Sequence, residues 1–218
     1  MKDKQTKKTK KRRYFLYNFI KITGAPTILL MRPKILSIGK TKPKNIKKGA
    51  VIVANHNSFY DPIFCLCVFW RRSLHFIATK DLYRTKIMNF LLTHVNCIQV
   101  DKENFSMSCF HEVKEVLEED KLVMIYPEGG VNVNSNDILS FKSGAVLMAH
   151  KAGKPIVPMY IVKGKKWYNR WHCVMGDPVD VRELCGTFPT LEKINEVCVL
   201  LKNKEEELKE FYYRRKNR

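Results

Sequence analysis

Two patterns of apolar residues alternate along the chain, and their alternation predicts the fold. Short runs of β-branched and other apolar residues, bounded by polar or turn-forming residues, are typical of buried strands. These runs cover residues 49–55, 74–79, 96–101, 121–126, 155–162 and 171–180. Segments with apolar residues at helical spacing cover residues 62–71, 82–93, 106–120, 141–153 and 188–216. Strands that alternate with helices and are apolar on both faces indicate an α/β fold with a mixed, largely parallel sheet flanked by helices.

The length and composition of the chain limit it to one core. It has 218 residues, of which 45% are hydrophobic, and no internal repeat or low-complexity linker divides it. A chain of this size closes one sizeable core, with room for at most a small appendage. We therefore predict a single α/β domain over residues 35–188, followed by a C-terminal helix and basic tail over residues 189–218, with Thr190 as the helix cap.

The first 34 residues differ from the rest and indicate contact with a membrane. Residues 1–13 hold eight basic side chains and one acidic one, which predicts a disordered tail. Residues 14–34 are apolar and aromatic, but polar residues, glycine and proline interrupt the roughly 20 apolar residues that a bilayer span requires. We predict a helical segment at the membrane interface and peripheral or monotopic attachment at the cytoplasmic face. The alternatives are a tail that only solubilises the chain and an apolar segment that packs on the domain.

The excess of basic residues points to an anionic partner. Forty lysine and arginine residues against 21 acidic ones give a formal net charge of +19, which favours nucleic acid, anionic lipid headgroups or a phosphorylated substrate. The seven cysteines include no CxxC pair, so buried thiols in a reducing compartment explain them better than a disulfide or zinc framework. The six histidines include no HExxH motif, and we predict no metal site.

The first candidate for chemistry lies in the sequence VIVANHNSFYDPIF. His56 follows a predicted strand, and Asp61 precedes Pro62, which is suited to the first position of a helix. The turn between them can bring the carboxylate to one imidazole nitrogen and leave the other to act as a general base. The alternatives are that Asp61 only caps the helix and that His56 is a structural histidine at a strand end.

The second candidate is the sequence YPEGG, which also follows a predicted strand. It holds the carboxylate of Glu128 on a turn that contains Gly129 and Gly130. Sites in α/β sheets gather at the ends of strands, although a glutamate in a turn can also be simply solvated. The lysines in other segments that can converge on the same edge are Lys80, Lys102 and Lys142.

The order of these pieces resembles that of the glycerolipid acyltransferases, the 1-acylglycerol-3-phosphate (lysophosphatidate) acyltransferase family. That family is marked by an NHxxxxD block, seen here as Asn55-His56-Asn57-Ser58-Phe59-Tyr60-Asp61. The further matching blocks are ATKDLY at 78–83, IQVDK at 98–102, YPEGG at 126–130, FKSGA at 141–145, KPIVPMYI at 154–161 and GDPVD at 176–180. The resemblance runs from about residue 35 to about residue 188.

The resemblance implies a glycerol-phosphate acyltransferase-like fold and an activity. A fatty acyl group moves from acyl-CoA or acyl carrier protein to the free hydroxyl of a lysophospholipid, with 1-acylglycerol-3-phosphate as the leading acceptor. His56 is then the base and Asp61 its orienting partner, with no bound cofactor and no covalent acyl-enzyme. The implied substrate-binding residues are Asn55, Ser58, Lys80, Lys102, Glu128, Gly129, Gly130 and Lys142. The implied partners are both substrates and an anionic membrane surface, with acyl carrier protein as a further candidate and no nucleic acid.

Two departures from the family pattern leave the acceptor open. Val131 stands where the family has an arginine that is thought to bind the acceptor's phosphate, and Lys102 stands where the family has an arginine after an aspartate. Lysine keeps the charge but lacks the bidentate fork of arginine, whereas valine removes the charge. Either Lys80, Lys102 or Lys142 then holds the phosphate, or the acceptor is another lysolipid.

Two interpretations from other classes remain at this stage. A nucleic-acid-binding protein is suggested by the net charge and by aromatic residues near basic ones at 167–171 and 212–215. It leaves the pairing of His56 with Asp61 unexplained. A membrane-bound protein with a lapsed active site is suggested by the lost arginine. Both interpretations predict no acyl transfer.

Overall fold

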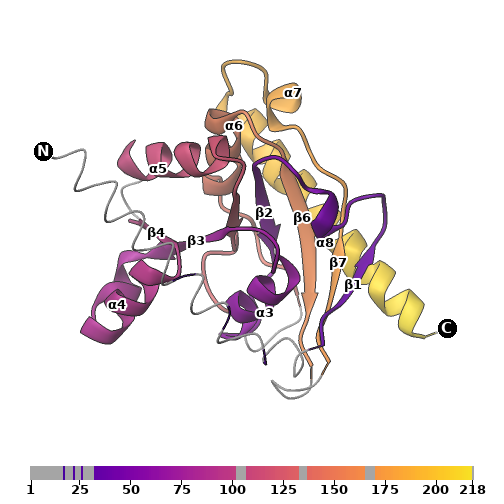
Figure 1. The fold of residues 1–218 in the computed structure, drawn as a ribbon. Helices are drawn as coiled ribbons and strands as arrows, with labels where there is room; N and C mark the ends of the chain where they lie inside the picture. The colour runs from indigo at the N-terminus through magenta and orange to yellow at the C-terminus, as the bar shows by residue number, and fades with distance from the viewer. Residues whose placement is uncertain are drawn as a thin grey trace, which may run out of the picture.

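Seven strands form a single sheet in the part of the chain that the structure describes. The computed structural model describes residues 17, 22, 26, 32–101, 107–132, 137–164 and 170–217. The sheet has the order β1-β7-β6-β2-β5-β3-β4 (Figure 1). Its strands are β1 (Lys34–Ser37), β2 (Ala50–Ala54), β3 (Leu74–Thr79), β4 (Cys97–Val100), β5 (Leu122–Ile125), β6 (Ile156–Val162) and β7 (His172–Met175). The helices are η1 (Pro43–Asn45), α3 (Asp61–Val68), η2 (Lys80–Tyr83), α4 (Lys86–His94), α5 (Met107–Glu118), α6 (Gly144–Ala152), α7 (Val181–Cys185) and α8 (Leu191–Lys216).

All but one of the strand pairs are parallel. β2 pairs in parallel with β6 and β5, and β3 pairs in parallel with β5 and β4. β7 runs antiparallel to β6, and β1 joins the outer side of β7 in parallel. The prediction of a single α/β domain with a mixed, largely parallel sheet is confirmed. Strands flank β2 on both sides, and all five of its residues are buried, as its unbroken apolar sequence requires.

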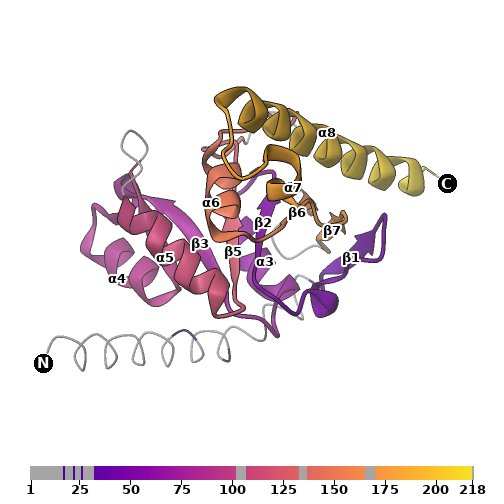
Figure 2. The ribbon, with the colours of Figure 1, turned by 90° about the horizontal axis from the view of Figure 1, so that it is seen from above.

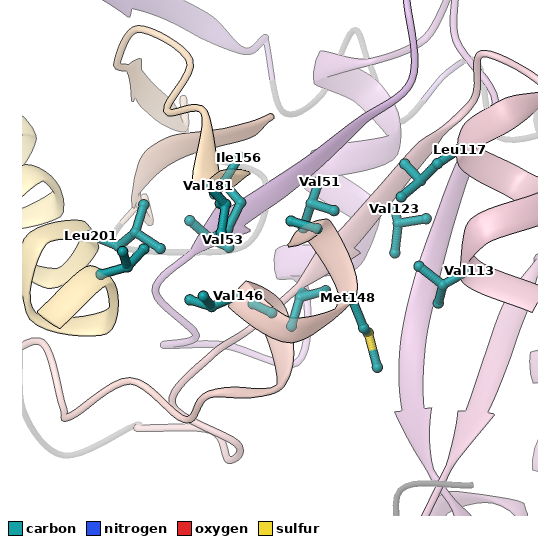
Figure 3. Close-up of a cluster of buried hydrophobic side chains, with 14 of the residues drawn as sticks. Val51, Val53, Val113, Leu117, Val123, Val146, Met148, Ile156, Val181 and Leu201 are labelled. Carbon is teal, nitrogen blue, oxygen red and sulfur yellow. The ribbon is translucent and has the colours of Figure 1, made fainter. Parts of the chain in front are cut away.

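Alternate side chains of β2 enter two different cores, one on each face of the sheet, because successive side chains of a strand point to opposite sides. Val51 and Val53 pack on the side of α5, α6 and α8 (Figure 3). Ala50, Ile52 and Ala54 pack on the side of α3. Residues of the first core that Figure 3 labels on the helices are Val113, Leu117, Val146, Met148, Val181 and Leu201. Helices thus cover both faces of the sheet, and loops lie at the ends of its strands.

The C-terminal helix α8 is part of the domain and not an appendage. Figure 2 shows it running past α6, α7, β6 and β7, on the side away from α4. Its start is capped by the Thr190 hydroxyl, which accepts a hydrogen bond from the backbone N–H of Lys193 (3.3 Å), as predicted. Further along, Leu208 and Tyr212 pack on Tyr160 of β6 and Val174 of β7.

The structure differs from the predicted elements in several places. Strand β1 and helices η1 and α7 were not predicted, because three to five residues are too short to show a period. The helix predicted over 82–93 is split into η2 and α4. The strand predicted over 171–180 ends at Met175, and Val179 instead forms an isolated bridge with Ile156.

The predicted N-terminal tail and most of the predicted interface segment lie outside the described residues. Of that segment, Tyr17 is buried, and its hydroxyl accepts a hydrogen bond from the backbone N–H of Leu74 (3.2 Å). Ile22 is exposed. Within the described ranges no helix has both the length and the apolar character of a membrane span.

Candidate active site

The two polar loops leave the sheet side by side. β2 and β5 are parallel neighbours with Val53 opposite Ile125, so the segments that follow them start at the same edge. The backbone N–H of Asn132, in the loop after β5, donates to the carbonyl oxygen of His56 (2.6 Å). The structure therefore brings the turn that carries His56 and the loop that carries Glu128 together, at the edge where sites gather in sheets of this type.

The side chains of His56 and Asp61 are in direct contact. Nδ1 of His56 lies 2.9 Å from Oδ2 of Asp61. The backbone N–H groups of Asn57 and Ser58 donate to the same oxygen, at 2.8 and 2.9 Å. Asp61 lies in the first turn of α3 and is fully buried, whereas 15% of the His56 side chain is exposed. The carboxylate thus fixes the proton on Nδ1 and leaves Nε2 as the basic nitrogen.

Tyr126 fixes the plane of the imidazole. The rings of His56 and Tyr126 are stacked, with centroids 4.0 Å apart and planes 14° from parallel. Burial raises the pKa of the Tyr126 phenol well above its usual value, so the ring stays neutral. No role for Tyr126 was predicted from the sequence, although its position at the end of a buried strand, as the first residue of YPEGG, was a usable signal.

Asn55 and Ser58 shape the turn. The side-chain amide of Asn55 donates to the carbonyl of Ile161 (3.0 Å) and accepts from the N–H of the same residue (2.7 Å). It therefore joins the end of β2 to β6, and both of its polar groups are used within the fold. The hydroxyl of Ser58 accepts from the N–H of Tyr60 (3.2 Å). Both residues were predicted to bind substrate. Their hydrogen bonds in the structure stabilise the conformation of the turn.

Gly129 of the second loop makes room for a lysine. Gly129 has φ of +76°, and a Cβ there would lie 2.8 Å from Cε of Lys142. The loop closes through a hydrogen bond from the N–H of Lys142 to the carbonyl of Pro127 (2.9 Å). A Cβ on Gly130 would meet nothing within 4 Å. The loop thus holds an exposed cation, Lys142, over Gly129, and the space next to Gly130 is open.

Glu128 faces inward and is not the solvated turn residue of the alternative interpretation. Its side chain is buried, and burial raises the pKa of its carboxyl above the usual value. The backbone N–H groups of His56 and Leu139 partly oppose this shift. The carboxyl thus lies beneath the turn that carries His56.

The other predicted lysines are placed differently. Lys80, at the start of η2, is 62% exposed and pairs with Asp101 at 2.8 Å between Nζ and Oδ2. Lys102 lies outside the described residues. Lys163, which no motif indicated, donates from Nζ to the carbonyl of Asn57 (3.4 Å). The only sequence signal for it was a lysine directly after a long buried strand.

In the described ranges no three His, Cys, Asp or Glu side chains are grouped as they would be around a metal ion.

Fold and site together define a class: an α/β protein with a histidine–carboxylate pair and a glutamate loop at the carboxyl edge of its sheet. The family model described as Acyltransferase matches residues 36–162. This match covers more than half of the chain, and the chain belongs to the acyltransferase family.

Curated relatives and a solved structure agree with this family. A probable 1-acyl-sn-glycerol-3-phosphate acyltransferase of Mycoplasma pneumoniae is 32% identical over 55% of this chain and 47% of its own length. A 1-acyl-sn-glycerol-3-phosphate acyltransferase of Streptococcus pneumoniae is 26% identical over 66% of this chain and 54% of its own length. The chain spans about half the length of these relatives. The crystal structure of the 1-acyl-sn-glycerophosphate acyltransferase PlsC of Thermotoga maritima has the same fold, with a TM-score of 0.61 at 23% identity, covering 92% of this chain and 82% of that one.

Proposed function

We propose that the protein is an O-acyltransferase that moves a fatty acyl group from a thioester to the free hydroxyl of 1-acylglycerol-3-phosphate, giving phosphatidic acid. The observation that carries the proposal is the 2.9 Å contact between Nδ1 of His56 and the fully buried Asp61. The names of the relatives support the choice of acceptor and the place in phospholipid synthesis. The acyl donor is acyl-CoA or acyl carrier protein.

The reaction is a direct transfer in which the imidazole moves one proton. Nε2 of His56 takes the proton of the acceptor hydroxyl while the oxygen forms a bond to the thioester carbonyl carbon. The tetrahedral intermediate then breaks its carbon–sulfur bond, and the departing thiolate takes the proton back from Nε2. Asp61 holds Nδ1–H and stabilises the imidazolium that forms between the two steps, while Tyr126 keeps the ring in place.

The environment of Cys65 supports a route without an acyl-cysteine. Cys65 contacts the site through Tyr126, because its sulfur lies 3.7 Å from the hydroxyl of that residue. It is fully buried, and burial raises the pKa of its thiol well above the usual value. A nucleophilic cysteine needs an accessible thiolate, which this position disfavours.

The acceptor's phosphate needs a cation that Val131 does not provide. Lys142, over Gly129, and Lys163, beside the carbonyl of Asn57, are two described cations in contact with the loops of the site. Lys80 is already paired with Asp101. We assign the phosphate to Lys142 first and to Lys163 second, each acting as a point charge.

The main experiment measures acyl transfer by the full chain. Purified protein is given 1-acylglycerol-3-phosphate with acyl-CoA or acyl carrier protein thioester, and phosphatidic acid and free thiol are measured. His56→Ala should lower turnover by about 10²–10⁴, as the loss of a general base does. His111→Ala, a change at an exposed histidine on α5, is the matched control and should have normal activity. Near-normal turnover by a folded His56→Ala protein would refute the mechanism, and no transfer by the wild type would refute the activity.

A second measurement tests the acceptor. Turnover on 1-acylglycerol-3-phosphate is compared with turnover on neutral and zwitterionic lysolipids, for the wild type and for Lys142→Met. The proposal expects a preference for the phosphate monoester and a rise in its KM in Lys142→Met, with little change for the neutral acceptor. A preference of the wild type for an uncharged acceptor would favour a different lysolipid, as the valine at position 131 allows.

We also propose peripheral or monotopic attachment to the cytoplasmic face of an anionic membrane. The support is the basic and aromatic sequence of residues 1–34 together with the lipid acceptor named in the relatives. The contact of Tyr17 with β3 shows that this segment also packs on the domain at one point.

A further inference from the structure

Several large apolar side chains are exposed near the catalytic edge of the sheet. Phe59, inside the turn that carries His56, is 77% exposed. Leu82 of η2 is 48% exposed, and Ile87 and Phe90 of α4 are 80% and 62% exposed. We call Leu82, Ile87 and Phe90 the α4 face. Apolar side chains gathered in this way on a protein surface mark a contact with another molecule or with lipid.

The α4 face lies at the same end of the sheet as the active site. β3 is parallel to β2 and separated from it only by β5, so the two strands end at the same edge. The chain leaves β3 directly into η2 and α4, as it leaves β2 into the turn that carries Phe59. Figure 1 shows α4 and α3 toward the lower end of the molecule and α7 at the upper end. Ile87 and Phe90 are three residues apart on α4 and therefore share one side of that helix.

Basic residues surround these apolar side chains. Residues 80–90 hold three basic side chains and one acidic one, and all three basic side chains, those of Lys80, Arg84 and Lys86, are exposed. Lys80 is paired with Asp101 and Arg84 with Asp81, both at 2.8 Å, so the excess positive charge is that of Lys86, which directly precedes Ile87. Exposed apolar side chains next to an excess of positive charge form the pattern of a surface that binds at the interface of an anionic bilayer.

We propose that the α4 face, together with Phe59, is a docking surface for an anionic lipid bilayer, distinct from the N-terminal segment. Docking there turns the catalytic edge toward the lipid, so that an acceptor need move only a short way from the bilayer to His56. The inference rests on the proposed function for the identity of the occupant, since a lipid acceptor resides in a bilayer.

The first test compares two pairs of substitutions. Ile87→Asn with Phe90→Asn removes the apolar side chains of α4. Phe188→Asn with Leu191→Asn is the matched control, because those side chains are 90% and 72% exposed. Phe188 follows α7, which Figure 1 shows at the other end of the molecule, and Leu191 is the first residue of α8. In flotation with phosphatidylglycerol-containing vesicles we expect the α4 pair to partition about tenfold more weakly than the wild type, and the control pair as the wild type does.

The second test reports on the α4 face even if residues 1–34 keep the protein on the vesicles. Phe90→Trp and Phe188→Trp are each mixed with vesicles that contain brominated lipid, and the added tryptophan emission is compared with that of the wild type. Quenching of the tryptophan at 90 but not of that at 188 is the expected result. Equal quenching at both positions, or none at 90 in vesicle-bound protein, would overturn the proposal.

A third measurement separates this inference from the proposed function. A short-chain 1-acylglycerol-3-phosphate that stays monomeric in water should be acylated equally well by the wild type and by the Ile87→Asn/Phe90→Asn protein, whereas acylation of vesicle-borne acceptor should fall in the variant. Absence of turnover on both substrates would count against the proposed function, while the quenching result would still decide the docking surface. A dimer in the absence of lipid that the same variant abolishes would instead make the α4 face a protein interface.

Discussion

Two carboxyl groups are fully buried close to the catalytic edge, and their surroundings are opposite. Asp61 receives three donors on Oδ2, from Nδ1 of His56 and from the backbone N–H groups of Asn57 and Ser58. Glu205 of α8 is equally inaccessible, but neither of its oxygens has a hydrogen-bond partner of normal geometry among the described residues.

The difference between the two carboxyl groups lies in the hydrogen-bond donors around them, which decide whether a buried acid can carry a charge. Donors around Asp61 stabilise its charge, and that charge orients the imidazole that is the base of the proposed reaction. Burial raises the pKa of the Glu205 carboxyl well above its usual value, and the nearby Glu128 adds to the shift, while only the backbone N–H of Asn55 opposes it. The surroundings of Glu205 therefore favour its neutral form, and its contribution to the stability of the fold depends on pH.

The largest effect is expected from Asp61→Asn. The amide cannot accept the three hydrogen bonds as a carboxylate does and no longer holds His56 in the tautomer with a basic Nε2. Turnover on a water-soluble acceptor should fall by about 10²–10⁴. Asp137→Asn, at a side chain that is 86% exposed, is the control and should change turnover by less than about twofold. Rates are compared after circular dichroism shows both proteins folded, and an unimpaired Asp61→Asn enzyme would remove the orienting role.

A smaller effect, on stability, is expected from Asn55→Ala. The change leaves the N–H and the carbonyl of Ile161 without their partner in a buried place, and each unsatisfied group costs about 1–3 kcal/mol. The free energy of unfolding in urea should fall by about 2–6 kcal/mol, the sum for the two groups. Asn45→Ala is the control, because its amide makes one exposed hydrogen bond. A loss as small as that of the control would show that the link between β2 and β6 is not needed.

The smallest effect is expected from Glu205→Gln and depends on pH. Because the pKa of Glu205 is raised in the folded protein, the wild type loses stability as the pH rises above the pKa of a glutamate in the unfolded chain. Gln removes this loss, so the variant should gain about 1–3 kcal/mol relative to the wild type between pH 5 and pH 8. Urea titrations at both pH values measure it. The exposed Glu206→Gln is the control, and a difference that does not grow with pH would contradict the assignment.

The sequence predicted the parts of the site that are close together along the chain. The pairing of His56 with Asp61 needs only a turn after a buried strand, and the proline at position 62 supplied that signal. The six predicted strands are present, because short apolar runs bounded by turn-forming residues rarely adopt a conformation other than a buried strand. The position of Glu205 could not be predicted, because its proximity to Asn55 and Glu128 depends on where α8 crosses the sheet. Lys163 was missed for the same reason, since its contact depends on β6 lying next to β2.

The stacked ring of Tyr126 has a consequence for the path of the incoming alcohol. It covers one side of the imidazole, while Asp61 occupies one of the two nitrogens, so an alcohol can give up its proton only along the rim of the ring at Nε2. In the proposed transfer to 1-acylglycerol-3-phosphate, the one free hydroxyl of the acceptor therefore has to arrive from that direction. The ring of Tyr126 thus sets the path of the acceptor as well as the plane of the imidazole.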